Sequence, residues 1–396
     1  MSGRDYLKIW YRVQIGTTLI VLAMMMVRNF ELGRIIWLQL LWMVIVLGIG
    51  LGIELWDENA PAIIQKINCW LQGIAQPFIL TFAWGVITRE IITVLQMPSR
   101  GVVSIMIIYY FVMYAPFASV IGGEMEWGME RFLFILWMFQ IVIVPFSVLP
   151  FDLIDNRKLT LLLSTGAVGA VAYFIFMVTL MRAWHLSWPG LKPNWSNDFN
   201  WWIFLLIIGI FIIPLSSEMM AITSIHRGNL FELTCQAFEA GLAEETLFRF
   251  GMLGVLFYAW RSFKQRLPLA IITSSILFGC AHLLNYGTQG LSLTTYQVLM
   301  ATVLGIFFAV TYVYTGQLWL VMLMHFSIDW FSFVVDGTDR MVGTLTNADW
   351  LGLAFMVVLF GGFSIWMMFG QRRQVMDRHV KRLTGEYQHF GFTIQY

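Results

Sequence analysis

The 396-residue sequence contains little charge. Asp, Glu, Lys and Arg together make up 12% of the residues, whereas 59% are hydrophobic. This ratio lies far outside the range of soluble domains and indicates a polytopic membrane protein. The net charge is only +1, and no basic stripe interleaved with aromatic residues occurs outside the C-terminal tail. Nucleic acid is therefore excluded as an expected partner.

Cysteine is equally scarce. The three cysteines are Cys69, Cys235 and Cys280, and no two of them have the CxxC spacing. Their number and spacing predict neither a disulfide framework nor a thiolate zinc site. Each lies in or beside an apolar segment, so we expect all three to be buried as small hydrophobic side chains.

Long apolar runs fill the chain. A helix needs about 20 apolar residues to cross the ~30 Å hydrocarbon core of a bilayer. Windows of that length predict about twelve membrane spans and therefore an all-α, polytopic membrane helix bundle. The predicted spans are 10–27, 35–55, 69–88, 101–123, 131–151, 159–181, 201–225, 231–260, 267–286, 293–316, 318–335 and 350–370.

The connector at residues 182–200 is rich in Trp, Pro and Asn and divides the predicted bundle. Residues 1–200 form an N-terminal region of about six spans with almost no internal charge, and its function is open. Residues 201–370 hold the buried ionisable groups, and residues 371–396 form a basic tail. Lys and Arg in this tail and in the 261–266 loop place both in the cytoplasm. Together with the lack of targeting signals, the composition favours a multi-pass protein of a bacterial plasma membrane.

Ionisable side chains gather inside the C-terminal apolar segments. Each costs roughly 2.5–3.5 kcal/mol to insert, so such groups are usually paired and functional. Glu245 and Arg249 are four residues apart and can pair on one helix face. Glu244 is rotated by about 100° from Glu245, so it points elsewhere and can face a cavity. It is the candidate general base.

Two later spans each add a polar face. Phe278 and His282 are four residues apart, as are His325 and Asp329, so each pair can meet on its own helix. The Asp329 carboxylate can hold the tautomer of His325, or can itself donate a hydrogen bond when protonated.

In order, these motifs are Glu-Glu-x-x-x-Arg, Phe-x-x-x-His and His-x-x-x-Asp. The stretch 235–335 that contains them resembles the CAAX protease and bacteriocin-processing family, also called the abortive infection family, of intramembrane glutamic endopeptidases. The resemblance implies that Glu244 and His282 activate a water molecule, while His325 and Asp329 stabilise the oxyanion.

Under the same resemblance Glu245, Arg249 and Phe278 are supporting residues, and the mechanism needs no metal or other cofactor. Glu244 and the histidines also have ligand chemistry that suits zinc, so zinc stays open. The last motif position is often Asn in the family, and here it is Asp329. An ionised Asp cannot donate a hydrogen bond, so Asp329 either acts on an oxyanion in its protonated form or serves only to orient His325.

Three classes of function stay open. The leading one is an endopeptidase that cuts a hydrophobic peptide or membrane-protein substrate in or near the bilayer. The second is a non-catalytic scaffold of the same fold that regulates a partner enzyme or confers toxin immunity, with residues 1–200 binding the protein partner. The third is a transporter that uses the same acids and histidines as a proton relay. Glu239 matches no motif and is interpreted as channel-lining or interfacial.

Overall fold

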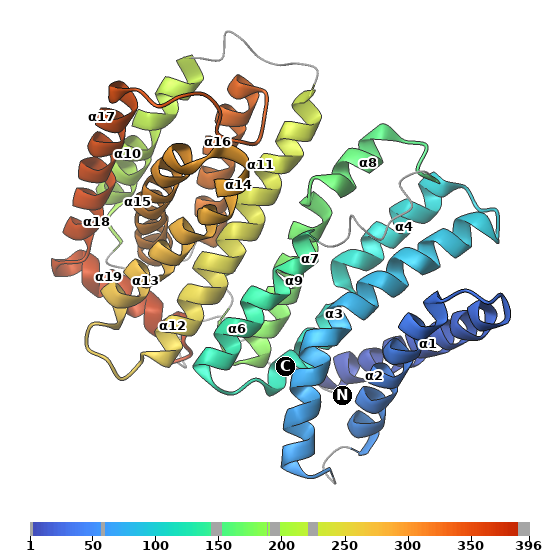
Figure 1. Cartoon of the computed structure of the whole chain (residues 1–396). Coiled ribbons are helices and arrows are strands. Elements are labelled where there is room, and N and C mark those ends of the chain that lie inside the picture. Colours follow the sequence, from blue (N-terminus) through green and yellow to red (C-terminus); the bar gives the residue numbers. More distant parts are fainter. Residues whose placement is uncertain are drawn as a thin grey trace. The chain divides into compact units, whose positions relative to one another are not determined.

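The computed structural model describes residues 3–56, 60–143, 153–187, 189–190, 199–220 and 229–386. The chain divides into two compact units, unit 1 up to Trp184 and unit 2 from His185 onward. All regular secondary structure in the described ranges is helical (Figure 1), which confirms the predicted all-α class. The predicted connector at 182–200 contains the division between the units, and its residues 188 and 191–198 lie outside the described ranges.

Unit 1 consists of nine α-helices and one short 3-10 turn within the residues described. They are α1 (Gly3–Glu31), α2 (Ile36–Trp56), α3 (Ala62–Thr93), α4 (Ser99–Val112), α5 (Ala115–Val120), the 3-10 turn Gly122–Glu124, α6 (Gly128–Met138), α7 (Gln140–Ile143), α8 (Arg157–Ser164) and α9 (Ala167–Ala183).

Unit 2 contains two π-helical segments and a 3-10 turn between its α-helices. They are α10 (Trp201–Met220), α11 (Leu230–Glu245), the π-helix Thr246–Met252, α12 (Leu253–Ala259), α13 (Arg266–Ala281), the 3-10 turn His282–Asn285, α14 (Tyr286–Gln289), α15 (Leu291–Thr315), α16 (Leu318–Asp336), α17 (Asn347–Met356), the π-helix Val357–Gly361, α18 (Gly362–Met367) and α19 (Gly370–Leu383).

Eight helices among the described residues are long and apolar enough to cross a membrane, or nine if the bent pair α8 and α9 is one span. These nine correspond to nine of the about twelve predicted spans. Of the other three, 131–151 is only partly described, and the apolar part of α10, Trp201–Ser216, is short. The third, 231–260, is a long helical stretch that carries several acids and Arg249. The chain is a multi-pass membrane protein with eight or nine membrane-length apolar spans among the residues that the structure describes.

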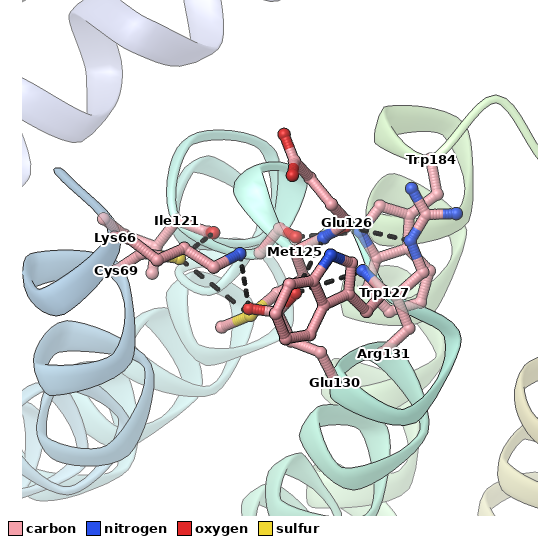
Figure 2. Close-up of polar contacts among 10 residues, drawn as sticks. Lys66, Cys69, Ile121, Met125, Glu126, Trp127, Glu130, Arg131 and Trp184 are labelled. Atoms are coloured by element: carbon pink, nitrogen blue, oxygen red, sulfur yellow. Dashed lines mark hydrogen bonds and ion pairs between the residues drawn. The ribbon is translucent and has the colours of Figure 1, made fainter. Parts of the chain in front are cut away.

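Unit 1 holds an ion pair between Lys66 and the buried Glu130, just outside the predicted spans 69–88 and 131–151. Lys66 Nζ on α3 lies 2.6 Å from Glu130 Oε1 on α6 (Figure 2). The other carboxylate oxygen of Glu130 accepts hydrogen bonds from the backbone N–H groups of Glu126 (2.9 Å) and Trp127 (3.1 Å). Glu130 therefore caps its own helix and joins it to α3. The pair is hidden in the sequence because its partners are 64 positions apart.

Arg131 lies beside this pair. Its Nε donates a hydrogen bond to the Met125 carbonyl at 2.9 Å, and its guanidinium lies 5.0 Å from the ring centroid of Trp184 (Figure 2). The Trp184 indole N–H donates to the Gly122 carbonyl at 2.8 Å. Through these contacts, Arg131 and Trp184 stabilise the turn between α5 and α6.

Two of the three cysteines are buried as predicted, namely Cys69 and Cys235, but Cys280 is exposed. The reason is helical geometry. Ser275 and Gly279 of α13 face α15, because a Cβ at the neighbouring position Gly305 would contact Ser275 and one at Gly279 would lie 2.7 Å from the Val298 carbonyl oxygen. Cys280 is rotated by about 100° from Gly279 and so lies off this interface.

Two close helix contacts build the core of unit 2. Helix α11 packs against α16, and α13 packs against α15. A Cβ on Gly241 of α11 would lie 2.8 Å from the Phe326 backbone nitrogen and 2.9 Å from the Met322 carbonyl oxygen of α16. Side-chain Cβ atoms do not come that close to backbone atoms, so only glycine permits this approach. It brings the acids of α11 next to the histidine of α16.

Candidate active site

The two acidic residues of the first motif lie where α11 changes its winding. The α-helix ends at Glu245, and the chain continues directly as a π-helix over Thr246–Met252 before α12 begins. A π-helical turn is wider than an α-turn and occurs often at functional sites. Arg249 lies within this turn and is fully buried.

Glu245 joins two residues. Its Oε2 lies 3.2 Å from Arg249 Nε, which confirms the predicted pair, and both side chains are fully buried. Its Oε1 lies 2.9 Å from His325 Nδ1 on α16. A carboxylate can only accept a hydrogen bond, so Nδ1 carries the proton of this contact when Glu245 is ionised. The sequence prediction did not include the link to His325.

The second nitrogen of His325 faces two further acids. Nε2 lies 3.3 Å from Asp329 Oδ2, as the four-residue spacing predicted, and 3.9 Å from Glu244 Oε2. Glu244 and Glu245 thus both approach His325, although they are adjacent in a helix and point in different directions. This is geometrically consistent because the imidazole ring presents its two nitrogens on different sides.

His282 follows the last turn of α13. Its Nδ1 lies 3.0 Å from the Phe278 carbonyl oxygen. A carbonyl oxygen only accepts hydrogen bonds, so Nδ1 is the donor, and Nε2 of a neutral His282 is then an acceptor. His282 and Glu244 interact electrostatically, but no direct hydrogen bond joins them within the described part of the chain.

Phe278 is the aromatic centre of the site. Its ring centroid lies 5.2 Å from that of His282 and 5.7 Å from that of His325, edge-on in both cases. The Arg249 guanidinium lies 4.6 Å from the same ring, an arrangement in which the ring face attracts the cation. The predicted supporting residues Glu245, Arg249 and Phe278 therefore all contact the histidines or each other.

The exposed fraction of the side chain separates four charged residues of the site into two groups. The side chains of Glu245 and Arg249 are 0% exposed, whereas those of Glu244 and Asp329 are 27% and 22% exposed. Only the second group can contact water or a substrate without rearrangement. The structure therefore brings all seven predicted residues into one region and places Glu244 and Asp329 at its accessible side.

Three contributors were not predicted for the site. Phe308 of α15 packs against the His325 ring with 5.7 Å between centroids. Gly241 permits the close approach of α11 and α16. Glu239 interacts electrostatically with Glu244 and Asp329, and its place five residues before Glu244 was the only sequence signal for it.

A metal site needs several ligand side chains that converge on one point. In the portion that the structure describes, no group of three or more His, Cys, Asp and Glu side chains could hold a metal ion. Both nitrogens of His325 already face carboxylates, which leaves that ring without an open ligand position. The predicted absence of a metal stays a prediction.

A family comparison covers the segment that contains the site. A model of the family described as Type II CAAX prenyl endopeptidase Rce1-like matches residues 226–331. This segment is an Rce1-like domain. It contains all seven predicted site residues, and it confirms the resemblance to CAAX proteases. The domain is of the CAAX-type intramembrane protease family, and proteases are hydrolases. Searches of curated proteins and of solved structures found no match for the chain.

Proposed function

We propose that unit 2 is an intramembrane glutamic endopeptidase that hydrolyses a peptide bond of a hydrophobic peptide or membrane-associated protein. The observation that carries the proposal is the arrangement of Glu244 and Glu245 on the two sides of the His325 ring, with His282 near Glu244. A water-activating site requires an accessible acid close to a histidine, here Glu244 and His282. It also requires a buried acid that orients a second histidine, here Glu245 and His325.

In the proposed reaction, Glu244 removes a proton from a water molecule while the Nε2 of His282 accepts a hydrogen bond from the same water. The hydroxide attacks the carbonyl carbon and the carbonyl π bond opens to an oxyanion. Collapse of this intermediate breaks the C–N bond, and the proton held by Glu244 passes to the leaving amine. One water and one peptide bond give one acid and one amine, without a metal or cofactor.

His325 stabilises the oxyanion in this proposal. Glu245 holds Nδ1 at 2.9 Å, so the ring is fixed with Nε2 toward the accessible side. Because Nδ1 donates to Glu245, a proton on Nε2 as well makes the ring an imidazolium. This second proton points at Asp329 in the resting site, 3.3 Å away, and at the oxyanion during reaction. Asp329 in its ionised form positions Nε2–H but gives the oxyanion no hydrogen bond of its own.

Partners and location are proposed on the same basis. The substrate is hydrophobic because the site lies among membrane-length helices, and prenylated and unprenylated peptides both fit that description. We propose that the protein lies in a bacterial plasma membrane with a cytoplasmic C-terminus. The basic residues of α19 and of the 261–266 loop lie at one end of unit 2, which supports the orientation.

The test is cleavage of a library of hydrophobic and prenyl-cysteine peptides by the purified full-length protein. Glu244→Gln and His282→Ala should each lower kcat by about 10²–10⁴-fold, the usual contribution of a general base. Glu232→Gln is the matched control, because it makes the same substitution in the first turn of the same helix and should retain activity. All variants must melt like the wild type.

Several outcomes would overturn the proposal. Cleavage by Glu244→Gln within about tenfold of wild type would remove Glu244 as the base. Loss of activity on chelation with recovery on adding zinc would replace the metal-free mechanism. No cleavage by folded wild-type protein, with Glu244→Gln still complementing a deletion strain, would instead make the protein a scaffold.

A further inference from the structure

Helix α19 is an amphipathic helix held against the rest of unit 2. Its buried residues recur along one face, namely Val375, Met376, His379, Val380 and Leu383. This face packs against α15, α13 and α18. Residues 371–386 of the predicted basic tail therefore belong to the packed helical part of unit 2.

Polar contacts fix α19 beside the turn between α12 and α13. Arg373 Nη2 donates a hydrogen bond to Gln265 Oε1 at 3.0 Å. Arg266, the first residue of α13, contacts both carboxylate oxygens of Glu386 at 2.5 Å and 3.1 Å. His379 Nδ1 donates to the Val313 carbonyl near the end of α15 at 2.8 Å. The turn and the helix thus form one continuous surface.

This surface concentrates positive charge. Residues 261–266 and 370–386 contain eight Lys and Arg residues against two acids, a net charge of +6, whereas the whole chain carries only +1. The cations on the outer side, here called the basic surface, are Arg261, Lys264, Arg372, Arg373, Arg378 and Lys381. Both acids pair with cations, Glu386 with Arg266 and Asp377 with Arg373, whose Nε lies 3.7 Å from Asp377 Oδ2.

The basic surface also lies where the bilayer ends. Two membrane-length segments, Arg266–Gln289 and Asn347–Met367, have ends next to it. Large aromatic side chains are exposed at its edges, with Phe263 at 57% and Phe369 at 61%. The Arg372 guanidinium lies 3.8 Å from the Trp366 ring centroid. Aromatic residues combined with Lys and Arg in this way are typical of the headgroup region of a membrane.

We propose that the basic surface binds the headgroups of anionic phospholipids in the adjacent leaflet. Charge complementarity selects the anionic lipid, and exposed Phe263 and Phe369 favour a membrane over a soluble protein or nucleic acid. Each cation near an anionic lipid surface contributes roughly a fivefold preference. This proposal does not depend on the protease function.

The test counts lipids bound to the full-length protein by native mass spectrometry, in micelles that contain equal amounts of phosphatidylglycerol and phosphatidylcholine. A quadruple variant carries Arg261→Gln, Lys264→Gln, Arg378→Gln and Lys381→Gln. These substitutions leave the Arg266 and Arg373 contacts that hold α19. The variant should lose at least about tenfold of the wild-type preference for phosphatidylglycerol, and the wild-type preference should fall as salt is raised.

The matched control removes the same charge from unit 1 through Arg89→Gln, Arg100→Gln, Arg157→Gln and Lys158→Gln, all at exposed positions. It should keep the wild-type lipid preference. An equal loss in both variants would assign the preference to net charge and overturn the proposal. So would an unchanged preference in the first variant, or a wild-type preference that does not respond to salt, and the latter test needs no variant to fold.

Discussion

Gly241 is the residue on which the contact between α11 and α16 depends most directly. In Gly241→Ala the new Cβ would lie 2.8–3.0 Å from backbone atoms of Met322 and Phe326, whereas unstrained contacts of carbon are about 3.5–4.0 Å. Backbone atoms cannot rotate away, so α11 and α16 must move apart by roughly 0.5–1 Å. Such overpacking costs about 1–3 kcal/mol, which offsets the gain of up to about 1 kcal/mol in helix propensity from Gly to Ala.

The separation also stretches the contacts of His325 with Glu245 and Glu244, because these lie on the two helices that part. A misplacement of about 1 Å in a catalytic site costs on the order of 10²-fold in rate. We therefore expect Gly241→Ala to lower the melting temperature in detergent by a few degrees and to lower kcat by about 10–100-fold.

The matched control is Gly352→Ala in α17, where a Cβ would meet nothing within 4 Å. This variant should melt at the wild-type temperature or above it and keep full activity. If Gly241→Ala melts no lower than Gly352→Ala and cleaves its substrate normally, the close approach of α11 and α16 is not what holds the site, and the reasoning is refuted.

Three further predictions follow from single contacts. Glu245→Gln should destabilise the protein by about 3–5 kcal/mol because it leaves the charge of buried Arg249 uncompensated, and thermal melts should show a smaller loss when Arg249→Gln is added. Asp329→Asn should raise kcat up to about tenfold at neutral pH because an amide can donate to the oxyanion, and a large loss of kcat would mean that the charge of Asp329 is needed. Burial and the nearby Arg382 lower the pKa of His379 from 6.5 to about 4, so the unfolded state binds the proton first. Stability should then fall by up to about 3 kcal/mol as the pH drops from 6.5 to 4, and melts of His379→Asn should show a smaller fall over that window.

Interactions between residues close in sequence were predictable. The pairs Glu245–Arg249 and His325–Asp329 are each four positions apart, and the helix itself places their side chains together. The same holds for the ring contact of Phe278 with His282. Each pair could be predicted once its segment was known to be helical, and the long apolar runs indicated the helices.

Contacts between helices were not predictable in the same way. Glu245 and His325 are 80 positions apart, and nothing local indicates that one carboxylate serves both Arg249 and a histidine of another helix. Lys66 and Glu130 in unit 1 pair across a similar distance in the chain.

The sequence by itself determined the membrane class, the all-α fold and the contacts between residues four positions apart in one helix, because hydrophobicity and helical periodicity are local properties. The tertiary structure decided how those residues are divided in role, with Glu245 buried behind His325 and Glu244 at the accessible side. It also decided that the basic tail is docked as α19. Both results depend on which helix faces pack together, and small features such as the absent side chain of Gly241 set that packing.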